Sequence, residues 1–149
     1  MERPPKVFRG GIPFMVEAAI AYGGKSGAVG EGQKGEVVRF ANRVPLLFDA
    51  GNCAITEGVK TIDWSRYDLK GWEDMPITLF VNFTSVYVPY TGAGKLAIAN
   101  EEEIVAEIRN ALMECARGIA TYLRTLRHAE EQEARRSIFF RYIVEIAQA

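Results

Sequence analysis

A glycine-flanked lysine is the first feature of this sequence that could do chemistry. Gly92-Ala93-Gly94-Lys95 lies between an apolar segment and a long amphipathic one, where backbone amides and a lysine can meet a phosphate. It is not a Walker A loop, because Pro89 stands at the position of the first glycine and Leu96 replaces the magnesium-binding Ser or Thr. Spacing alone leaves two interpretations open: a lysine that contacts phosphate, and a solvated lysine on an exposed loop.

An aromatic and basic tetrapeptide is the second candidate. Trp64-Ser65-Arg66-Tyr67 places two large rings around a cation. Such a group can stack on a partner, cover the edge of a core or grip a sugar-phosphate backbone. Burial is the commoner use of large aromatic side chains, so a tryptophan at the core edge beside a solvated arginine is the simpler alternative. Both interpretations stay open.

Nucleophilic and metal chemistry find no support in the sequence. Cys53 and Cys115 lie far apart, and nothing places either one beside the single histidine, His128. One histidine and two cysteines cannot build an ordinary zinc site. The acidic runs 101–103 and 130–133 are typical of helix ends and solvated faces. We expect no metal site, and free thiols in a reducing cytoplasm.

The segments that must position these residues begin with a strand pattern. Residues 14–22 are predicted to form a mostly buried strand, with a helix as the competing interpretation. The glycine-rich residues 23–35 are predicted to form a hairpin loop, from which residues 36–44 return as the partner strand. A short helix is expected within residues 49–62, capped by Asn52.

The second half of the chain changes period. Residues 76–89 alternate between apolar and polar side chains and are predicted to form the clearest strand. Asn100 and Glu103 make a capping box, after which apolar residues recur every three or four positions to Leu126. A charged stretch, 127–136, then precedes a second apolar helix face. That face consists of Ile138, Phe139, Tyr142, Ile143 and Ile146. A small core offers it no partner, so we expect it to dock onto another chain.

Composition limits the class of protein. The 149 residues are 48% hydrophobic and 25% charged, the balance of a single globular domain that can bury a core. Eighteen Lys and Arg against nineteen Asp and Glu leave a net charge of −1, so any contact with nucleic acid must be local. No apolar run approaches the ~20 residues of a membrane span, and no signal peptide is recognisable. We expect a cytoplasmic protein without membrane contact.

Five segments together resemble one protein family, in order and over nearly the whole chain. They are Arg3-Pro4-Pro5, residues 13–24 (PFMVEAAIAYGG), residues 39–47 (RFANRVPLL), Asp63-Trp64 and residues 88–95 (VPYTGAGK). They are similar to the transducer domain in the B subunit of archaeal-type DNA topoisomerase VI. The match extends to about residue 123, and residues 135–149 resemble the helical segment that leads toward the cleavage subunit.

The resemblance implies an α/β fold in which a β-sheet is backed by helices. It implies a βαβ unit with a left-handed crossover, against the usual right-handed rule, followed by a C-terminal helix. This is the GHKL-type transducer, which is similar to a ribosomal-protein-like α/β sandwich. We expect the transducer domain at residues 1–126, with its first strand missing. Residues 127–149 are expected to form a C-terminal helical segment toward the cleavage subunit.

The resemblance gives the glycine-flanked lysine a role. In that family a lysine on a strand-to-helix loop enters the neighbouring GHKL-type ATPase domain and contacts the γ-phosphate of ATP. By position this lysine is Lys95, preceded by Gly94. Its charge would complement a phosphate that is lost on hydrolysis, so the residue would distinguish ATP from ADP.

The resemblance also gives the tetrapeptide a role. The family's transducer carries a DNA-contacting WKxY motif, and Trp64, Arg66 and Tyr67 fall at its place. Ser65 stands where the motif has its lysine. Arg66 would supply the cation from the next position, in a different direction.

The implied function is that of the transducer region in the ATP-binding B subunit of a type IIB DNA topoisomerase. It would couple ATP binding and hydrolysis, with Mg²⁺, to strand passage and the relaxation of supercoils in double-stranded DNA. The implied partners are the A subunit of topoisomerase VI and a second B subunit, in an A2B2 heterotetramer in the nucleoid. The catalytic base, magnesium-binding asparagine and lid of the ATPase have no counterpart in this sequence. We therefore expect the chain alone to be inactive and to bind no cofactor tightly.

Two other classes of function compete with this one. The first is a freestanding nucleic-acid-binding module, in which residues 64–67 and the basic N-terminal third contact phosphates. The second is a regulatory paralogue that keeps the transducer as a scaffold for protein interactions. A phosphate-sensing Lys95 argues against the scaffold, which has no use for one.

Overall fold

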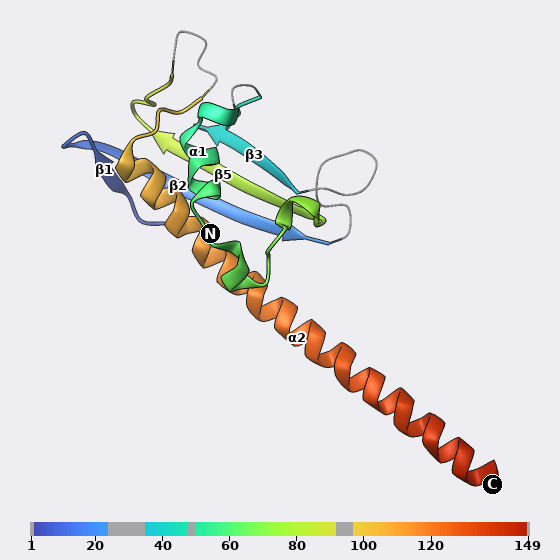
Figure 1. The fold of residues 1–149 in the computed structure, drawn as a ribbon. Coiled ribbons are helices and arrows are strands. Elements are labelled where there is room, and N and C mark those ends of the chain that lie inside the picture. Colours follow the sequence, from blue (N-terminus) through green and yellow to red (C-terminus); the bar gives the residue numbers. More distant parts are fainter. Residues whose placement is uncertain (1, 24–34, 48–49, 92–96, 149) are drawn as a thin grey trace.

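A five-stranded sheet with helices on one face forms the body of the molecule (Figure 1). The computed structural model describes residues 2–23, 35–47, 50–91 and 97–148. The strands lie in the order β1-β2-β5-β3-β4, so β5 is brought between strands that precede it in the chain. This is the α/β architecture with a C-terminal helix that the resemblance implies.

Two long antiparallel strands, β2 (Ile12–Tyr22) and β5 (Ile77–Ser85), form the centre of the sheet. The strand predicted at residues 14–22 is thus confirmed, and its helical alternative is wrong. The strand predicted at 76–89 is also present, but it ends at Ser85. Burial alternates along β5 because one face of the sheet packs against helices and the other does not. The buried side chains of the two strands include Val16, Ala18, Leu79, Val81 and Phe83.

The third long strand, β3 (Glu36–Ala41), pairs in parallel with β5 and not with β2. The predicted hairpin between residues 14–22 and 36–44 is therefore wrong. Its predicted loop, residues 23–35, lies almost wholly outside the described residues. Alternation of side chains identifies a strand but carries no information about the neighbour that the strand selects from elsewhere in the chain.

The sheet ends in a short strand at each edge. β1 (Lys6–Phe8) pairs with β2, and β4 (Val44–Pro45) pairs with β3, both antiparallel. Asn42 and Arg43, with φ of 48° and 65°, form the turn from β3 to β4, so the single strand predicted at 36–44 is two strands and a tight turn. Short edge strands offer little backbone for pairing with other chains.

The chain crosses from β3 to the parallel β5 over the helical face of the sheet, through α1 (Ala54–Lys60). When Figure 1 is turned until β3 and β5 point upward, α1 lies in front of the sheet and β5 lies to the left of β3. The crossover is therefore left-handed, the opposite of the usual sense. It also contains three 3₁₀ helices: η1 (Ala50–Asn52), η2 (Trp64–Tyr67) and η3 (Trp72–Asp74).

The start of α1 differs from its prediction. Its N-cap is Cys53, which makes no side-chain capping hydrogen bond, and Asn52 lies in η1. The predicted Asn52 cap is therefore wrong. Helix α1 is instead held by packing: Ala54, Ile55 and Val59 are buried, and tertiary burial of an apolar face contributes more to a short helix than a cap does.

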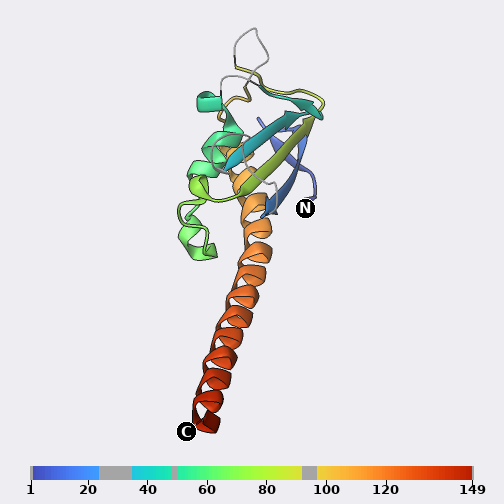
Figure 2. The same ribbon diagram turned by 90° about the vertical axis from the view of Figure 1, so that its right-hand side faces the viewer.

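A single helix, α2 (Glu102–Gln148), forms the last third of the chain. A cap at Asn100, as predicted, would start the helix at Glu101, whereas α2 starts one residue later, at Glu102. The helix then continues without a break through the charged stretch 127–136. After Gly118 the sequence has no glycine or proline, so nothing in the backbone interrupts it. The first half packs against β2 and α1, while the second half projects away from the sheet (Figure 2). All residues from Arg124 to Ala147 are exposed.

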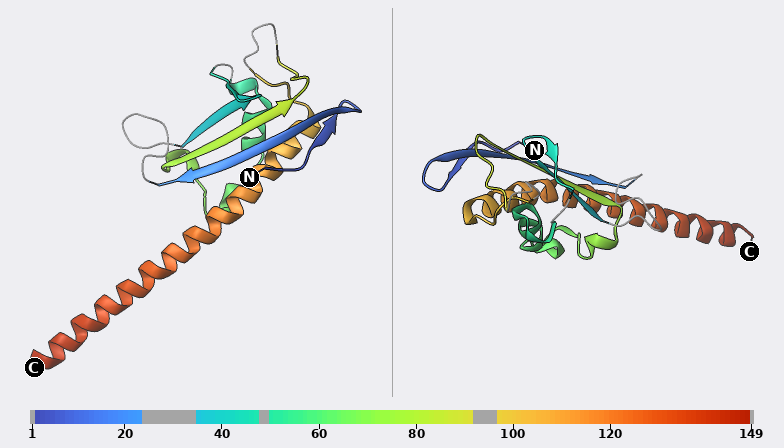
Figure 3. Two further views of the ribbon diagram at one scale, coloured as in Figure 1. Left: turned by 180° about the vertical axis from the view of Figure 1, so that it is seen from behind. Right: turned by 90° about the horizontal axis from the view of Figure 1, so that it is seen from above.

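The core lies between the sheet and the two α-helices, and the opposite face of the sheet carries no helix in the described structure (Figure 3). Phe14 stacks on Phe83, with their ring centroids 5.5 Å apart, and Phe8 meets Phe14 edge-on at 5.7 Å. Gly58 lets α1 approach α2 closely, because a Cβ at this position would lie 2.7 Å from Cγ2 of Ile108. The sheet, α1 and the first half of α2 thus form one packed unit.

Candidate functional site

Lys95 and Gly94, the predicted phosphate-contacting residues, lie outside the described residues. The structure does describe the residues on either side of the segment 92–96. The backbone N–H of Thr91 donates to the carbonyl of Ala97 over 2.8 Å. The five residues 92–96 are therefore enclosed between two positions that are hydrogen-bonded to each other.

The chain that follows this segment is anchored in the core. Ile98 is fully buried and forms a β-bridge with Tyr90. Its carbonyl accepts from the N–H of Ala54 over 2.9 Å, and its own N–H donates to Sγ of Cys53 over 3.4 Å. The base of the loop is thus tied to the start of α1, and a few residues later the chain enters α2.

The tetrapeptide 64–67 forms η2, which lies against α2. Asp63 caps this short helix: its carboxylate accepts from the backbone N–H of Ser65 over 3.3 Å and from the Ser65 hydroxyl over 2.5 Å. The residue that replaces the motif lysine therefore contributes to the local fold. This local capping stabilises the start of the 3₁₀ helix that follows α1.

Both aromatic rings of the tetrapeptide belong to the core. Trp64 is 8% exposed and Tyr67 is 6% exposed. The Trp64 indole N–H donates to the carbonyl of Val59 over 3.1 Å, and its ring lies 6.0 Å from that of Trp72. The rings hold η2 in place, so of the three predicted DNA-contacting residues only Arg66 is exposed.

Arg66 faces α2 across a shallow pocket of about 260 Å³. Its polar lining includes Thr61, Asp63, Arg109 and Asn110. Arg109 and Asn110 come from the first half of α2, so residues separated by more than 40 positions in the sequence share one surface. Two guanidinium groups lining one pocket are typical of a site for an anionic group.

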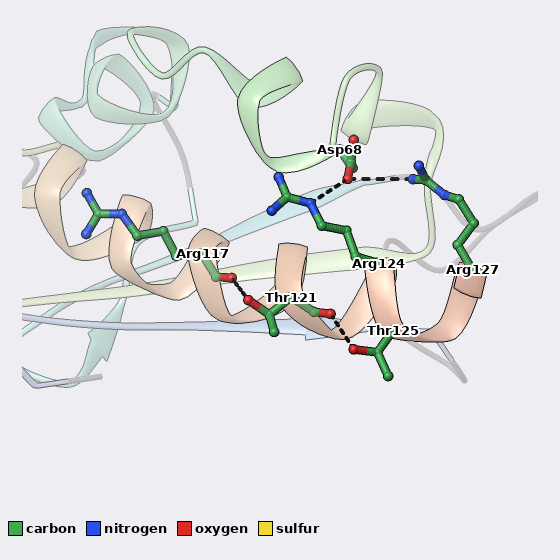
Figure 4. A network of polar contacts seen from close by, with 6 residues as sticks. All are labelled: Asp68, Arg117, Thr121, Arg124, Thr125 and Arg127. Carbon is green, nitrogen blue, oxygen red and sulfur yellow. Dashed lines mark hydrogen bonds and ion pairs between the residues drawn. The ribbon is translucent and has the colours of Figure 1, made fainter. Parts of the chain in front are cut away.

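Further arginines follow along α2, and one acidic residue joins two of them (Figure 4). The Asp68 carboxylate lies 3.4 Å from Nε of Arg124 and 3.6 Å from a terminal nitrogen of Arg127. Figure 4 shows Arg117 and Arg124 extending from the same side of the helix. Sequence patterns did not point to these arginines, because the periodicity of α2 identifies only its apolar face. Their spacing in the sequence could have revealed them, because Arg117 follows Arg109 by eight residues and Arg124 follows Arg117 by seven.

A partly buried ionic cluster joins the first residues of the chain to α2. The Arg3 guanidinium donates to the carboxylates of Glu107 and, over 2.7 Å, of Glu114. The hydrogen bond to Glu107 raises the pKa of Arg3 above its ordinary value, and the nearby negative charges add to this effect although burial opposes it. Glu107 is buried, so Arg3 supplies the charge that makes its burial tolerable.

The two thiols differ in their surroundings. Cys53 is buried, Cys115 is half-buried, and both are free. Burial raises the pKa of the Cys115 thiol, which lies 3.5 Å from the carbonyl of Ala18. Within the described ranges, the structure brings together no group of three or more His, Cys, Asp or Glu side chains suited to a metal ion. None of the described helices has the length and apolar character needed to cross a membrane.

Comparison with known proteins assigns the fold to a family. The family described as "Topoisomerase VI B subunit, transducer" matches residues 1–135. Three similar relatives are each named as the B subunit of type 2 DNA topoisomerase 6. The protein of Methanothermobacter thermautotrophicus is 54% identical over 95% of this chain and 27% of its own length. That of Pyrococcus furiosus is 51% identical and that of Thermococcus kodakarensis 49% identical, each over 99% of this chain and 25% of its own length.

The chain thus spans about a quarter of the length of these relatives. About half of the residues are identical over nearly the whole chain, and proteins that are this similar share one fold. The family match covers the sheet, α1 and the first half of α2. The left-handed crossover between β3 and β5 agrees with this assignment. The chain belongs to the family of topoisomerase VI B subunit transducers.

Proposed function

We propose that this chain is the transducer region of an ATP-binding B subunit in a type IIB DNA topoisomerase. It couples the binding and hydrolysis of ATP elsewhere in the enzyme to DNA strand passage and the relaxation of supercoils. The observation that carries the proposal is the match to B subunits over 95–99% of the chain. The order of the elements supports it, because Lys95 lies a few residues before α2, the longest of the described elements.

In this proposal Lys95 contacts the γ-phosphate of ATP bound in the neighbouring ATPase domain. Gly94 allows the backbone to approach the nucleotide closely, and the ammonium group makes a charge-assisted hydrogen bond to the phosphate. Hydrolysis removes that contact, so the loop responds to ATP and not to ADP. ATP and Mg²⁺ are held by the rest of the enzyme, and this chain supplies one phosphate contact.

The signal then passes along the chain into α2. Two residues after the segment 92–96 comes Ile98, which is hydrogen-bonded to α1, and α2 begins four residues after Ile98. A displacement of the loop therefore acts on a packed unit and not on a free segment. The exposed apolar residues at the far end of α2 contact the A subunit of the A2B2 enzyme, and Arg66 contacts DNA in the nucleoid.

The decisive experiment replaces Lys95 in the full-length enzyme. The Lys95→Ala enzyme should lose ATP-dependent relaxation of supercoiled DNA, with DNA-stimulated ATP hydrolysis also reduced. Lys95→Arg should rescue only in part, because a planar guanidinium does not fit a site shaped for a point charge. Lys6→Ala removes the same charge from the exposed edge strand β1 and is the matched control.

The stability of the protein distinguishes a lost contact from a damaged fold. A substitution in a loop should change the free energy of unfolding by no more than ~0.5 kcal/mol. Wild-type relaxation and wild-type ATP hydrolysis in the Lys95→Ala enzyme would contradict the proposal, and the lysine would then be an ordinary solvated residue.

A further inference from the structure

We propose that a hollow on the helix-free face of the sheet binds the side chain of an arginine from a partner protein. This hollow, called here the sheet hollow, has a volume of about 280 Å³. Its lining includes Glu2, Glu17, Phe40, Phe80 and Asn82, which come from β2, β3, β5 and the residues before β1. The described helices pack on the opposite face of the sheet (Figure 3), so the sheet hollow is separate from Lys95 and from η2.

The pairing of the strands brings four of these side chains into one row. Glu2 forms a β-bridge with Glu17, Glu17 lies opposite Asn82, and Asn82 lies opposite Phe40. Residues that are directly opposite each other on neighbouring strands share one face of the sheet. Arg3, the residue after Glu2, binds two glutamates of α2 on the other face, as the alternation of side chains along an extended segment requires.

The two carboxylates of the row have no cation between them. Among the described residues, neither Glu2 nor Glu17 makes an ion pair, and no lysine or arginine stands among those that line the sheet hollow. Like charges directly opposite each other in a sheet repel and destabilise the pairing. A cation bound beside both carboxylates removes this repulsion, so the charge of the hollow is complementary to a positively charged group.

The carboxylate of Glu17 is held in position by its neighbour in the row. The side-chain amide of Asn82 donates to Oε1 of Glu17 over 3.4 Å and to the hydroxyl of Thr84 over 3.1 Å. The amide oxygen of Asn82 accepts from the backbone N–H of Arg43 over 3.0 Å. These contacts fix the amide and leave the second oxygen of Glu17 without a hydrogen-bond partner among the described residues.

The aromatic walls of the sheet hollow favour arginine over other cations. Phe80 is 37% exposed, and the small side chain of Ala19 lies opposite it and leaves space beside the ring. A planar guanidinium group can stack on a phenyl ring and donate hydrogen bonds to carboxylates at the same time. A hydrated Mg²⁺ ion has no use for the rings, and the ammonium of lysine is more strongly hydrated than a guanidinium. Arginine is also enriched at protein–protein interfaces, so the partner is a protein segment that presents an arginine.

The test uses N-acetylarginine methylamide as the probe and records the amide NMR signals of this chain, labelled with a nitrogen isotope. A single side chain binds weakly, so the probe is titrated through the millimolar range. The signals of Glu17, Ala19, Phe80 and Asn82 should shift and reach saturation. N-acetylcitrulline methylamide has the same shape without the charge, and the lysine derivative has the charge without the planar group, so both should cause smaller shifts.

Variants of the hollow test each part of the site. Glu2→Gln and Glu17→Gln should each raise the Kd of the arginine probe by about fivefold, because each removes one ion pair. Phe80→Leu keeps an apolar side chain but removes the ring, and it should also raise the Kd. Glu133→Gln makes the same charge change in the exposed second half of α2 and should leave the Kd unchanged. Thermal unfolding of each variant checks that the fold is intact.

Four results would overturn the proposal. The first is that the arginine probe does not shift these signals, and the second is that the citrulline or lysine derivative shifts them equally. The third is a response of the same signals to Mg²⁺ that exceeds the response to the probe, which would assign the hollow to a metal ion. The fourth is a shift of these signals with protein concentration alone, which would mean that a second copy of this chain fills the hollow. The assay contains neither ATP nor DNA, so its result is independent of the Lys95 experiment.

Discussion

Two glycines in helices have opposite environments. Gly58 in α1 faces Ile108, and an added Cβ would lie 2.7 Å from its Cγ2 and 3.3 Å from its Cβ. Gly118 in α2 has no atom within 4 Å of the same position among the described residues. Helix propensity favours alanine over glycine by about 1 kcal/mol at either site. Any difference between the two glycine-to-alanine substitutions in their effect on the free energy of unfolding therefore comes from packing.

We expect Gly118→Ala to raise the free energy of unfolding by about 0.5–1 kcal/mol. Gly58→Ala should lower it by about 1–2 kcal/mol, because overpacking against Ile108 exceeds the gain in propensity. Urea denaturation of both variants measures the two changes against the wild type. A stabilising Gly58→Ala would mean that α1 and α2 can move apart at little cost, contrary to the close packing described here.

The Cys115 thiol should make stability depend on pH. Burial raises its pKa in the folded chain, so the unfolded chain loses the thiol proton first as pH rises. The neutral thiol makes its full contribution to the free energy of unfolding below about pH 8.5, the ordinary pKa of a cysteine. This contribution is lost as the pH rises through the raised pKa of the folded chain. The free energy of unfolding should therefore fall more steeply above about pH 8.5 in the wild type than in Cys115→Ala. Equal pH dependence in the two proteins would refute this expectation.

At the scale of elements, α2 consists of two parts with different energetic roles. Ile104, Ile108 and Leu112 in the first part are fully buried, whereas all residues from Arg124 to Ala147 in the second part are exposed. The charged stretch 127–136 does not end the helix. Arginine, glutamate, glutamine and alanine are good helix formers, and these residues make up most of the stretch.

Removing residues 135–149 should change the free energy of unfolding by less than ~0.5 kcal/mol, because the described residues of this segment are exposed. The helical signal in circular dichroism should fall in proportion to the residues removed. Leu112→Ala, in the packed part of the helix, is the contrasting variant and should cost about 2–5 kcal/mol. Global unfolding of the shortened chain would place the removed segment in the core.

The elements show what sequence patterns can and cannot predict. β2, β5 and the first part of α2 were predictable because burial of one face imposes a period on the residues themselves. The neighbour of β3 was not, since β5 reaches it from a distant part of the chain. Trp64 and Tyr67 were visible as candidates, but only the folded structure shows that their rings pack under η2 and leave Arg66 exposed. Lys95 and Gly94 lie outside the described residues, so their role stays a prediction.

At the scale of the whole molecule, Arg3 joins the first residues of the chain to the first third of its last helix. Its side chain is 16% exposed and that of Glu107 only 5%. Removing one partner of such a pair leaves a buried charge without compensation. The pair therefore sets the position of the N-terminal segment relative to α2.

Arg3→Ala should lower the free energy of unfolding by about 3 kcal/mol. Adding Glu107→Gln to it should restore part of the loss, since no buried charge then remains. Arg9→Ala breaks the more exposed ion pair with Glu101 and should cost less than about 1 kcal/mol. Chemical denaturation of the four proteins measures these values, and equal losses for Arg3→Ala and Arg9→Ala would show that the Arg3 cluster is an ordinary surface contact.

The projecting half of α2 has a mechanical consequence. The segment from about residue 126 to residue 148 is about 33 Å long at the rise of an α-helix, and it is rooted in a packed base on the sheet. It therefore acts as a lever arm. A tilt of about 10° at the base moves its tip by about 6 Å over that length, a displacement larger than most side-chain rearrangements. A small rotation of the packed unit formed by the sheet, α1 and the first half of α2 therefore displaces the C-terminal end of α2 by about the pitch of one helical turn.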